Sequence, residues 1–137
     1  MRDVIPDIDR WLAAGKPVAL ATVTDTWGSA PRRPGAHMAI SADGDIAGSV
    51  SGGCVEGAVI DEAQQVLASG AGRKLHYGVT DEESWEVGLA CGGQIDIFLQ
   101  PLDPASYAAI SARTKADQPV AFATVVDGEH IGDTRVL

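Results

Sequence analysis

The segment Gly48-Ser-Val-Ser-Gly-Gly-Cys-Val-Glu56 has the residue types and spacing best suited to chemistry. An apolar run ends there, two glycines predict a tight turn, and a helix is expected to begin at or near Cys54. Free N–H groups and the dipole at a helix start suit a phosphate or another anion, which predicts a site at Ser51, Gly52 and Gly53. The same position would lower the pKa of the Cys54 thiol. The alternative is that this cysteine is a small buried apolar residue and that the glycines only turn the chain.

A second cysteine lies beside glycines in Gly88-Leu-Ala-Cys-Gly-Gly93, directly before a predicted strand. Here Gly92 and Gly93 follow Cys91, whereas in the first motif the glycines precede the cysteine. Two cysteines at strand ends could converge on one pocket, although a chance arrangement would look the same. Thiolates are ligands for soft metals, so Cys54 and Cys91 are the candidate metal ligands. Two thiols without C-x-x-C or zinc spacing argue against a disulfide framework or a structural zinc site.

A third motif, residues 28–35, places an arginine pair in a loop that two prolines stiffen. Arginine guanidinium groups bind phosphate through two parallel hydrogen bonds, which makes Arg32 and Arg33 candidate phosphate ligands. Gly28 and Ser29 open the loop and belong to the same candidate site. The alternative is a solvated arginine pair on an acidic protein.

Charge and motif content exclude several classes of protein. The formal net charge of −9 argues against a nucleic-acid partner, because binding a polyphosphate requires clustered cations. No carboxylate occurs between Thr26 and Ala42, which suits an anionic ligand beside the arginine pair. There is no Walker loop, no G-x-G-x-x-G fingerprint and no G-x-S-x-G elbow. Trp27 and Trp85 flank the motifs and either cover an aromatic ligand or pack in the core.

The hydrophobic pattern predicts an α/β fold: a single mixed β-sheet with packed helices and glycine-rich turns. Residues 118–127 repeat the theme of residues 16–25, which predicts two strands of the same sheet. We expect residues 1–137 to form one domain, either a fragment ending in mid-strand or a domain whose last strand closes the sheet. Helices are expected near 4–14, 55–68 and 104–115, and strands near 18–24, 37–40, 46–50, 73–79, 94–99 and 119–126.

The location of the protein is expected to be cytoplasmic. No apolar run approaches the roughly 20 residues that span a bilayer. The first seven residues contain acids and no apolar signal-peptide core.

Three motifs in order carry a resemblance to a known family. They are Gly-Ser-Ala-Pro-Arg at 28–32, Gly-Ser-Val-Ser-Gly-Gly-Cys-Val-Glu at 48–56 and Cys-Gly-Gly at 91–93, with an Asp-Gly hairpin between the first two. In these motifs the chain resembles the XdhC/CoxI family of xanthine and CO dehydrogenase accessory and maturation factors. Related proteins usually carry a second, C-terminal Rossmann-like domain, which these 137 residues do not include.

The resemblance implies a chaperone rather than an enzyme. Family members bind the molybdenum cofactor (molybdopterin), a pterin dithiolene with a terminal phosphate, protect it and hand it to the apo-form of a molybdenum hydroxylase. Cofactor biosynthesis or sulfuration proteins are further expected partners, and we expect a homo-oligomer. The expected cofactor-binding residues are Gly28, Ser29, Arg32, Arg33, Ser51, Gly52, Gly53, Cys54, Glu56, Cys91, Gly92 and Gly93.

Two alternatives from other classes stay open. One is a thiol-dependent enzyme with Cys54 as nucleophile, for which the nearby sequence offers only Glu56 as a base. The other is a structural partner domain that binds the dehydrogenase without touching the cofactor.

Overall fold

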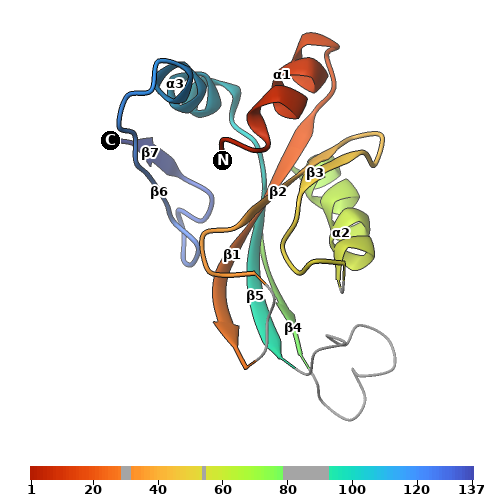
Figure 1. Cartoon of the computed structure of the whole chain (residues 1–137). Helices are drawn as coiled ribbons and strands as arrows, with labels where there is room; N and C mark the ends of the chain where they lie inside the picture. The colour runs from red at the N-terminus through yellow and green to blue at the C-terminus, as the bar shows by residue number, and fades with distance from the viewer. Residues whose placement is uncertain (29–31, 54, 79–92) are drawn as a thin grey trace.

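Five antiparallel strands form the sheet that carries the predicted motifs (Figure 1). This computed structural model describes residues 1–28, 32–53, 55–78 and 93–137. The strand order is β3-β2-β1-β5-β4, and a separate pair is formed by β6 and β7. The strands are β1 Val18–Trp27, β2 His37–Ser41, β3 Ile46–Gly48, β4 Arg73–Tyr77, β5 Gln94–Pro101, β6 Phe122–Thr124 and β7 Thr134–Val136. The helices are α1 Ile5–Ala13, α2 Glu56–Ser69 and α3 Pro104–Lys115.

The predicted α/β fold with helices packed on a sheet is confirmed, and two details are corrected. Every pairing among the described residues is antiparallel, whereas a mixed sheet was expected. Antiparallel neighbours need only short connections, and the β2–β3 hairpin turns through Asp43-Gly44 as predicted, with Gly44 at φ +87°. The sheet is also not single, because β6 and β7 stand apart from the other five strands.

The prediction that the two sequence repeats are strands of one sheet is wrong. Residues 16–25 contribute β1, which is paired on both sides, with β2 and with β5. In residues 118–127 only Phe122–Thr124 form a strand, and they pair with β7. Similar strand sequences share a preference for extended backbone, but the pairing partner depends on which strand edges are free.

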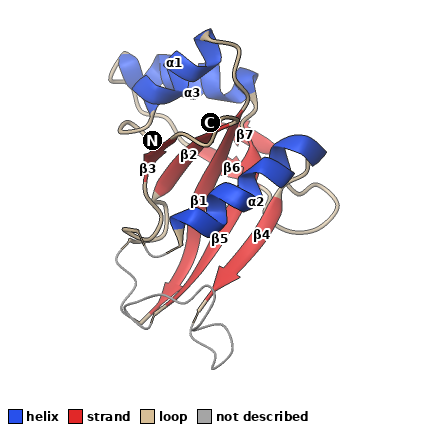
Figure 2. Cartoon of the chain, turned by 90° about the vertical axis from the view of Figure 1, so that its right-hand side faces the viewer, coloured by secondary structure: helices blue, strands red, loops and turns tan. Residues whose placement is uncertain are grey.

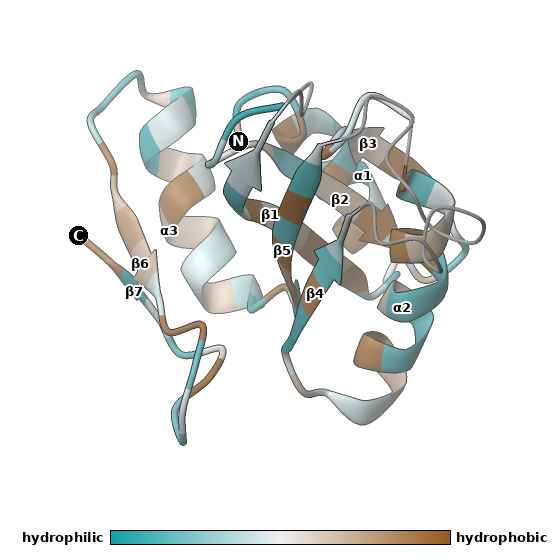
Figure 3. Ribbon diagram, turned by 90° about the horizontal axis from the view of Figure 1, so that it is seen from below, coloured by the Kyte–Doolittle hydropathy of each residue, from teal (hydrophilic) through white to brown (hydrophobic). Residues whose placement is uncertain are grey.

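Two apolar clusters hold the helices on the sheet. Helix α2 covers one face of the sheet (Figure 2), where its Val59, Ala63 and Val66 pack in one cluster with Ile95 and other strand residues. The second cluster joins α1 to the start of β1 and to Tyr107 of α3. Seen from below, α2 and the β6–β7 pair lie on opposite sides of β1, β5 and β4 (Figure 3). Among the described residues, no helix has the length and apolar character needed to cross a membrane.

At Gly48, the last residue of β3, any side chain should destabilise the folded protein. Its φ is +76°, and an added Cβ would overlap the His37 carbonyl oxygen and lie 2.8 Å from Val4. We expect Gly48→Ala to lower the free energy of unfolding by about 2 kcal/mol or more, because both strain and overlap must be relieved. The matched control is Gly57→Ala in α2, where an added Cβ meets nothing within 4 Å.

The control should raise the free energy of unfolding by about 0.5–1 kcal/mol, because alanine favours helix over glycine. Chemical denaturation of both variants measures the two effects. Equal stability of the two variants would contradict the packing described at Gly48.

Candidate functional site

The described residues that flank the three predicted motifs lie where strands end in the same direction along the five-stranded sheet, at staggered levels (Figure 1). Trp27 at the end of β1 pairs with Gln94 at the start of β5, and Tyr77 at the end of β4 pairs with Ile95. Gly48 at the end of β3 pairs with Met38 at the start of β2. Because neighbouring strands are antiparallel, β1, β3 and β4 all end in the same direction, but Gly48 is level with Ala21, six residues before Trp27.

The 49–55 loop carries the chain from an edge of the sheet to its middle. β3 is the outermost strand, whereas α2, which follows the loop, packs against β1 and β5. Val50 and Val55 are buried in the same apolar cluster as Tyr77 and Ile95. The loop therefore lies on the α2 face, close to the strands that flank the second cysteine motif.

The carboxylate of Glu56 organises this loop from within. Its Oε1 accepts hydrogen bonds from Ser49 Oγ (2.8 Å) and from the amides of Val50 (3.3 Å) and Ser51 (2.9 Å). Its Oε2 accepts from Ser51 Oγ (2.5 Å) and from the amide of Gly53 (2.9 Å). Glu56 is only 9% exposed, so these donors replace the water that the charge has lost.

Burial alone would raise the pKa of Glu56, but the hydrogen bonds from Ser51 and Ser49 outweigh it and hold the pKa at about 2. The Glu56 carboxylate is therefore ionised at neutral pH, and it accepts all of these hydrogen bonds. A carboxylate in this state is a poor general base, which weighs against a thiol enzyme that relies on Glu56.

The glycine turn itself differs in one respect from the prediction. Gly52 and Gly53 do turn the chain, at φ +72° and +116°, and α2 begins at Glu56, two residues after Cys54. The expectation that their amides face a cavity as free donors is wrong, because Gly52 donates to Ser49 Oγ (2.8 Å) and Gly53 to Glu56. The negative charge suited to this turn is supplied by the protein's own carboxylate.

The arginine pair divides into a half-buried and an exposed residue. Arg33 is exposed, and its carbonyl accepts a hydrogen bond from Ala36 in the turn that leads into β2. The Nε atom of Arg32 is buried and has no hydrogen-bond partner among the described residues. Nearby His37 is buried, and its burial lowers its pKa to about 4, so it is neutral at pH 7. Positive charge in the described part of this loop therefore comes from the arginines.

Four of the predicted site residues, Ser29, Cys54, Cys91 and Gly92, lie outside the described residues. Their expected roles, and the convergence of the two cysteines, stay predictions. Of the neighbouring residues, Gly28 is exposed at φ +70° directly after β1. Gly93 is buried directly before β5. Within the described residues, no group of three or more His, Cys, Asp or Glu side chains could hold a metal ion.

A histidine–carboxylate pair near the same end of the sheet was missed from the sequence. His76 Nδ1 lies 2.5 Å from Asp96 Oδ1, and the half-exposed Trp27 ring meets the His76 ring edge-on at 6.2 Å. These residues come from three strands, and their side chains alternate with Ile95 and Ile97, which face α2. Only the β4–β5 register, which pairs His76 with Asp96, could have revealed the contact.

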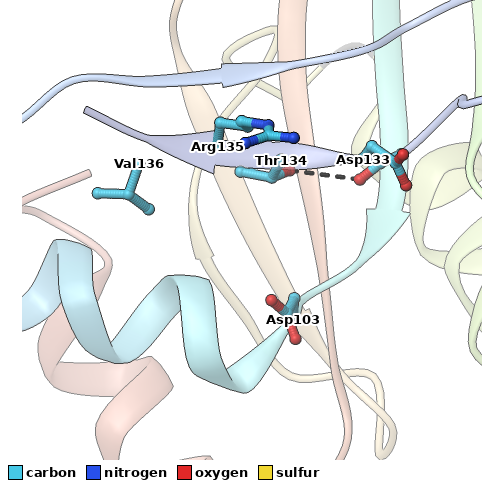
Figure 4. A pocket seen from close by; sticks show the side chains of 6 residues that line it. Asp103, Asp133, Thr134, Arg135 and Val136 are labelled. Atoms are coloured by element: carbon cyan, nitrogen blue, oxygen red, sulfur yellow. Dashed lines mark hydrogen bonds between the residues drawn. The ribbon is translucent and has the colours of Figure 1, made fainter.

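An open pocket of about 630 Å³ between the start of α3 and β7 contains none of the predicted site residues (Figure 4). Its Asp103 carboxylate caps α3, accepting hydrogen bonds from the Ser106 amide (3.1 Å) and hydroxyl (2.7 Å). These bonds lower the pKa of Asp103. Because the carboxylate is already engaged, we do not assign this pocket to the site.

Comparison with known proteins relates the chain to molybdenum enzyme systems. It is 38% identical over 111 residues to the molybdenum cofactor insertion chaperone PaoD of Escherichia coli (strain K12), covering 80% of this chain and 34% of PaoD. It is 32% identical over 95 residues to a probable xanthine dehydrogenase subunit of Bacillus subtilis (strain 168), covering 68% of this chain and 29% of that protein. The chain thus spans about a third of the length of these relatives.

A solved structure supports the same relationship. The crystal structure of a xanthine dehydrogenase from Bacillus halodurans matches 86% of this chain and 36% of its own, with a TM-score of 0.70 and 28% sequence identity. The family model described as "XdhC and CoxI family" matches residues 11–78, a range that contains β1 to β4, the arginine loop and the Glu56 loop. Through this segment, the chain belongs to the XdhC and CoxI family.

Proposed function

We propose that the chain binds the molybdenum cofactor as cargo and delivers it to a xanthine- or CO-dehydrogenase-type enzyme. The observation that carries the proposal is that the arginine loop, the Glu56 loop and the flanks of the second cysteine motif all leave or enter the sheet in the same direction along its strands, at staggered levels. The likeness to PaoD over most of the chain supports the same cargo.

The described residues fit the phosphate of the cofactor through Arg32. A buried guanidinium nitrogen without a described partner is costly unless a ligand or another group accepts a hydrogen bond from it. The amides of Gly52 and Gly53 do not fit this role, because they already donate within the loop. In the proposal Ser51, Gly52, Gly53 and Glu56 therefore hold the loop in shape.

The two cysteines are proposed as the ligands for the soft metal end of the cofactor. Both amides beside Cys54 in sequence are anchored: Gly53 donates to Glu56, and Val55 donates to Ser51 Oγ (3.0 Å). A loop fixed on both sides of the thiol needs little reordering when a ligand binds, which favours affinity. We include Cys91 because it lies two residues before Gly93 in the sequence, and Gly93 is buried directly before β5.

The Arg32→Ala variant tests the phosphate assignment. We expect it to lower the affinity for molybdopterin about tenfold or more, because hydrogen bonds involving charged groups contribute about 1.5–3 kcal/mol each. Added salt should weaken binding to the wild type more than to the variant, because the screened attraction has been removed. A titration followed by pterin fluorescence at two salt concentrations measures both effects.

Arg33→Ala is the matched control, since it removes the same charge from an exposed position of the same loop. We expect a smaller loss of affinity, although its long-range charge still contributes. Identical affinity and salt dependence for wild type and Arg32→Ala would remove Arg32 from the site. Cofactor binding that is absent altogether would favour a domain that grips the dehydrogenase only.

A further inference from the structure

The outer side of β4 is a free strand edge of the five-stranded sheet. β4 is the last strand on its side, and no described strand lies beyond it (Figure 2). Its five residues pair with β5 without a shift in register, whereas β3, on the opposite side of the sheet, has only three residues. Among the described residues, α2 packs mainly against β5 and β1 rather than on this edge. Such an edge offers backbone donors and acceptors to a further strand.

The register of the sheet determines which backbone groups of β4 point outward. The amide of Leu102 donates to the carbonyl of Val18 (2.8 Å), so every second residue of β5, counted back from Leu102, directs its backbone groups toward β1. The residues between them direct theirs toward β4, where their partners are Arg73, Leu75 and Tyr77. The N–H and C=O groups of Lys74 and His76 therefore point away from the sheet, toward the free edge.

The charges along this edge are balanced within the chain. Each basic side chain of β4 has a carboxylate partner: Arg73 with Glu62 at 2.5 Å, Lys74 with Asp127 at 3.4 Å and His76 with Asp96 at 2.5 Å. The edge is therefore close to neutral on a chain of net charge −9. Two copies of the chain can approach each other here with less of the repulsion that the acidic surface causes elsewhere. An edge with unpaired cations would instead have favoured an acidic strand from another protein.

We propose that two copies of the chain pair through their β4 edges, antiparallel and centred on Leu75, so that their two sheets become one. In this register Lys74 of each copy lies opposite His76 of the other, and the outward backbone groups of both residues bond to each other in two symmetric pairs. The two Leu75 side chains, each packed against the cluster on the α2 face, meet at the two-fold axis. The proposal is independent of the cofactor site, because it uses none of the residues assigned to that site.

Side-chain charges favour this register over its neighbours. The Lys74 ammonium reaches the His76 ring of the second copy, whose Nδ1 lies 2.5 Å from the Asp96 carboxylate, so a cation meets a ring backed by an anion. A register centred on Lys74 would set two ammonium groups opposite each other, which is unfavourable. A register centred on His76 would place Lys74 opposite Gly78, which has no side chain to contact it.

Sedimentation velocity of the intact chain over a range of concentrations tests the pairing. We expect a monomer–dimer equilibrium with a dissociation constant on the order of 10 μM, because one strand pair makes a small interface. Lys74→Pro should weaken the dimer at least tenfold, since proline removes an outward N–H group but none of the N–H groups that face β5. Lys74→Ala is the matched control, because it removes the same side chain and keeps the backbone donor. It should weaken the dimer less, and circular dichroism checks that both variants keep the fold.

Disulfide cross-linking tests the register, and it also decides the proposal if Lys74→Pro does not fold. In a chain that carries Cys54→Ser and Cys91→Ser, Leu75→Cys should give a cross-linked dimer on mild oxidation. Directly opposite residues of a non-hydrogen-bonded pair have Cα atoms about 4.5 Å apart, within the range of disulfides. The control is Lys74→Cys in the same chain, whose two thiols would lie diagonally and on the other face of the sheet. It should cross-link at least tenfold more slowly.

Three results would overturn the proposal. A wild type that stays monomeric at every concentration would leave the edge to a strand of another protein. A dimer that a folded Lys74→Pro variant does not weaken would place the interface elsewhere on the chain. Cross-linking that is as fast from position 74 as from position 75 would exclude the register centred on Leu75. Arg32→Ala should leave the dimer unchanged, so failure of the cofactor proposal would be seen independently.

Discussion

Replacing Glu56 with Gln is expected to lower the free energy of unfolding by about 2–4 kcal/mol. The carboxylate accepts hydrogen bonds at both oxygens from the Ser49–Gly53 segment. A glutamine would keep one oxygen but turn an NH₂ group toward buried donors, which would then lack an acceptor. Urea unfolding followed by circular dichroism measures the loss.

The control for this variant is Asp61→Asn, which neutralises an exposed carboxylate on the same helix. It should change the free energy of unfolding by no more than about 0.5 kcal/mol. Similar stability for Glu56→Gln and Asp61→Asn would contradict the role given to the Glu56 carboxylate.

The free energy of unfolding, measured as the pH is lowered, gives a second test of the Glu56 carboxylate. The pKa of Glu56 lies at about 2 in the folded protein, against an ordinary value of 4.5. Between these values the unfolded chain binds a proton that the folded chain does not, so this stabilisation is complete above pH 4.5 and is lost as the pH falls toward 2. Glu56→Gln lacks this contribution, so its stability should approach that of the wild type as the pH is lowered through this window.

Replacing Cys54 with Ser is expected to reduce cofactor delivery about tenfold or more while leaving the melting temperature nearly unchanged. Serine keeps the size of the side chain but removes a thiolate, which is the better ligand for a soft metal. The measurement is the activity of a molybdenum hydroxylase apo-enzyme after incubation with cofactor-loaded wild type or variant. Equal reconstitution by both proteins would leave Cys54 with a packing role only.

Local features of the fold could be predicted from the sequence because their signals are local. Asp103 before Pro104 is typical of a capped helix start, which the structure has at α3, and the predicted Asp43-Gly44 turn between β2 and β3 is confirmed. The partner of β6 could not be predicted, because Phe122–Thr124 and the matching part of β1 have nearly the same residues. Pairing depends on which strand edges are free after the whole sheet has assembled.

In the candidate site, too, some features could be predicted from local sequence and others depend on the folded structure. The Gly52-Gly53 turn and the helix after it follow from residue order, but the acceptor for its amides depends on how the loop closes around Glu56. The sequence alone favoured an external anion because free amides at a helix start are the usual situation. The His76–Asp96 contact likewise joins residues that are distant in the sequence.

The most direct test of the central claim is whether the purified chain carries molybdopterin, and whether Arg32→Ala loses it. Wild type, Arg32→Ala and Arg33→Ala would be produced in the same cofactor-synthesising host, and the bound pterin would be quantified by fluorescence after acid oxidation. We predict pterin in a fixed ratio to wild-type protein, about tenfold less with Arg32→Ala, and an intermediate amount with Arg33→Ala. Wild-type protein free of pterin, or equal pterin in all three proteins, would contradict the account.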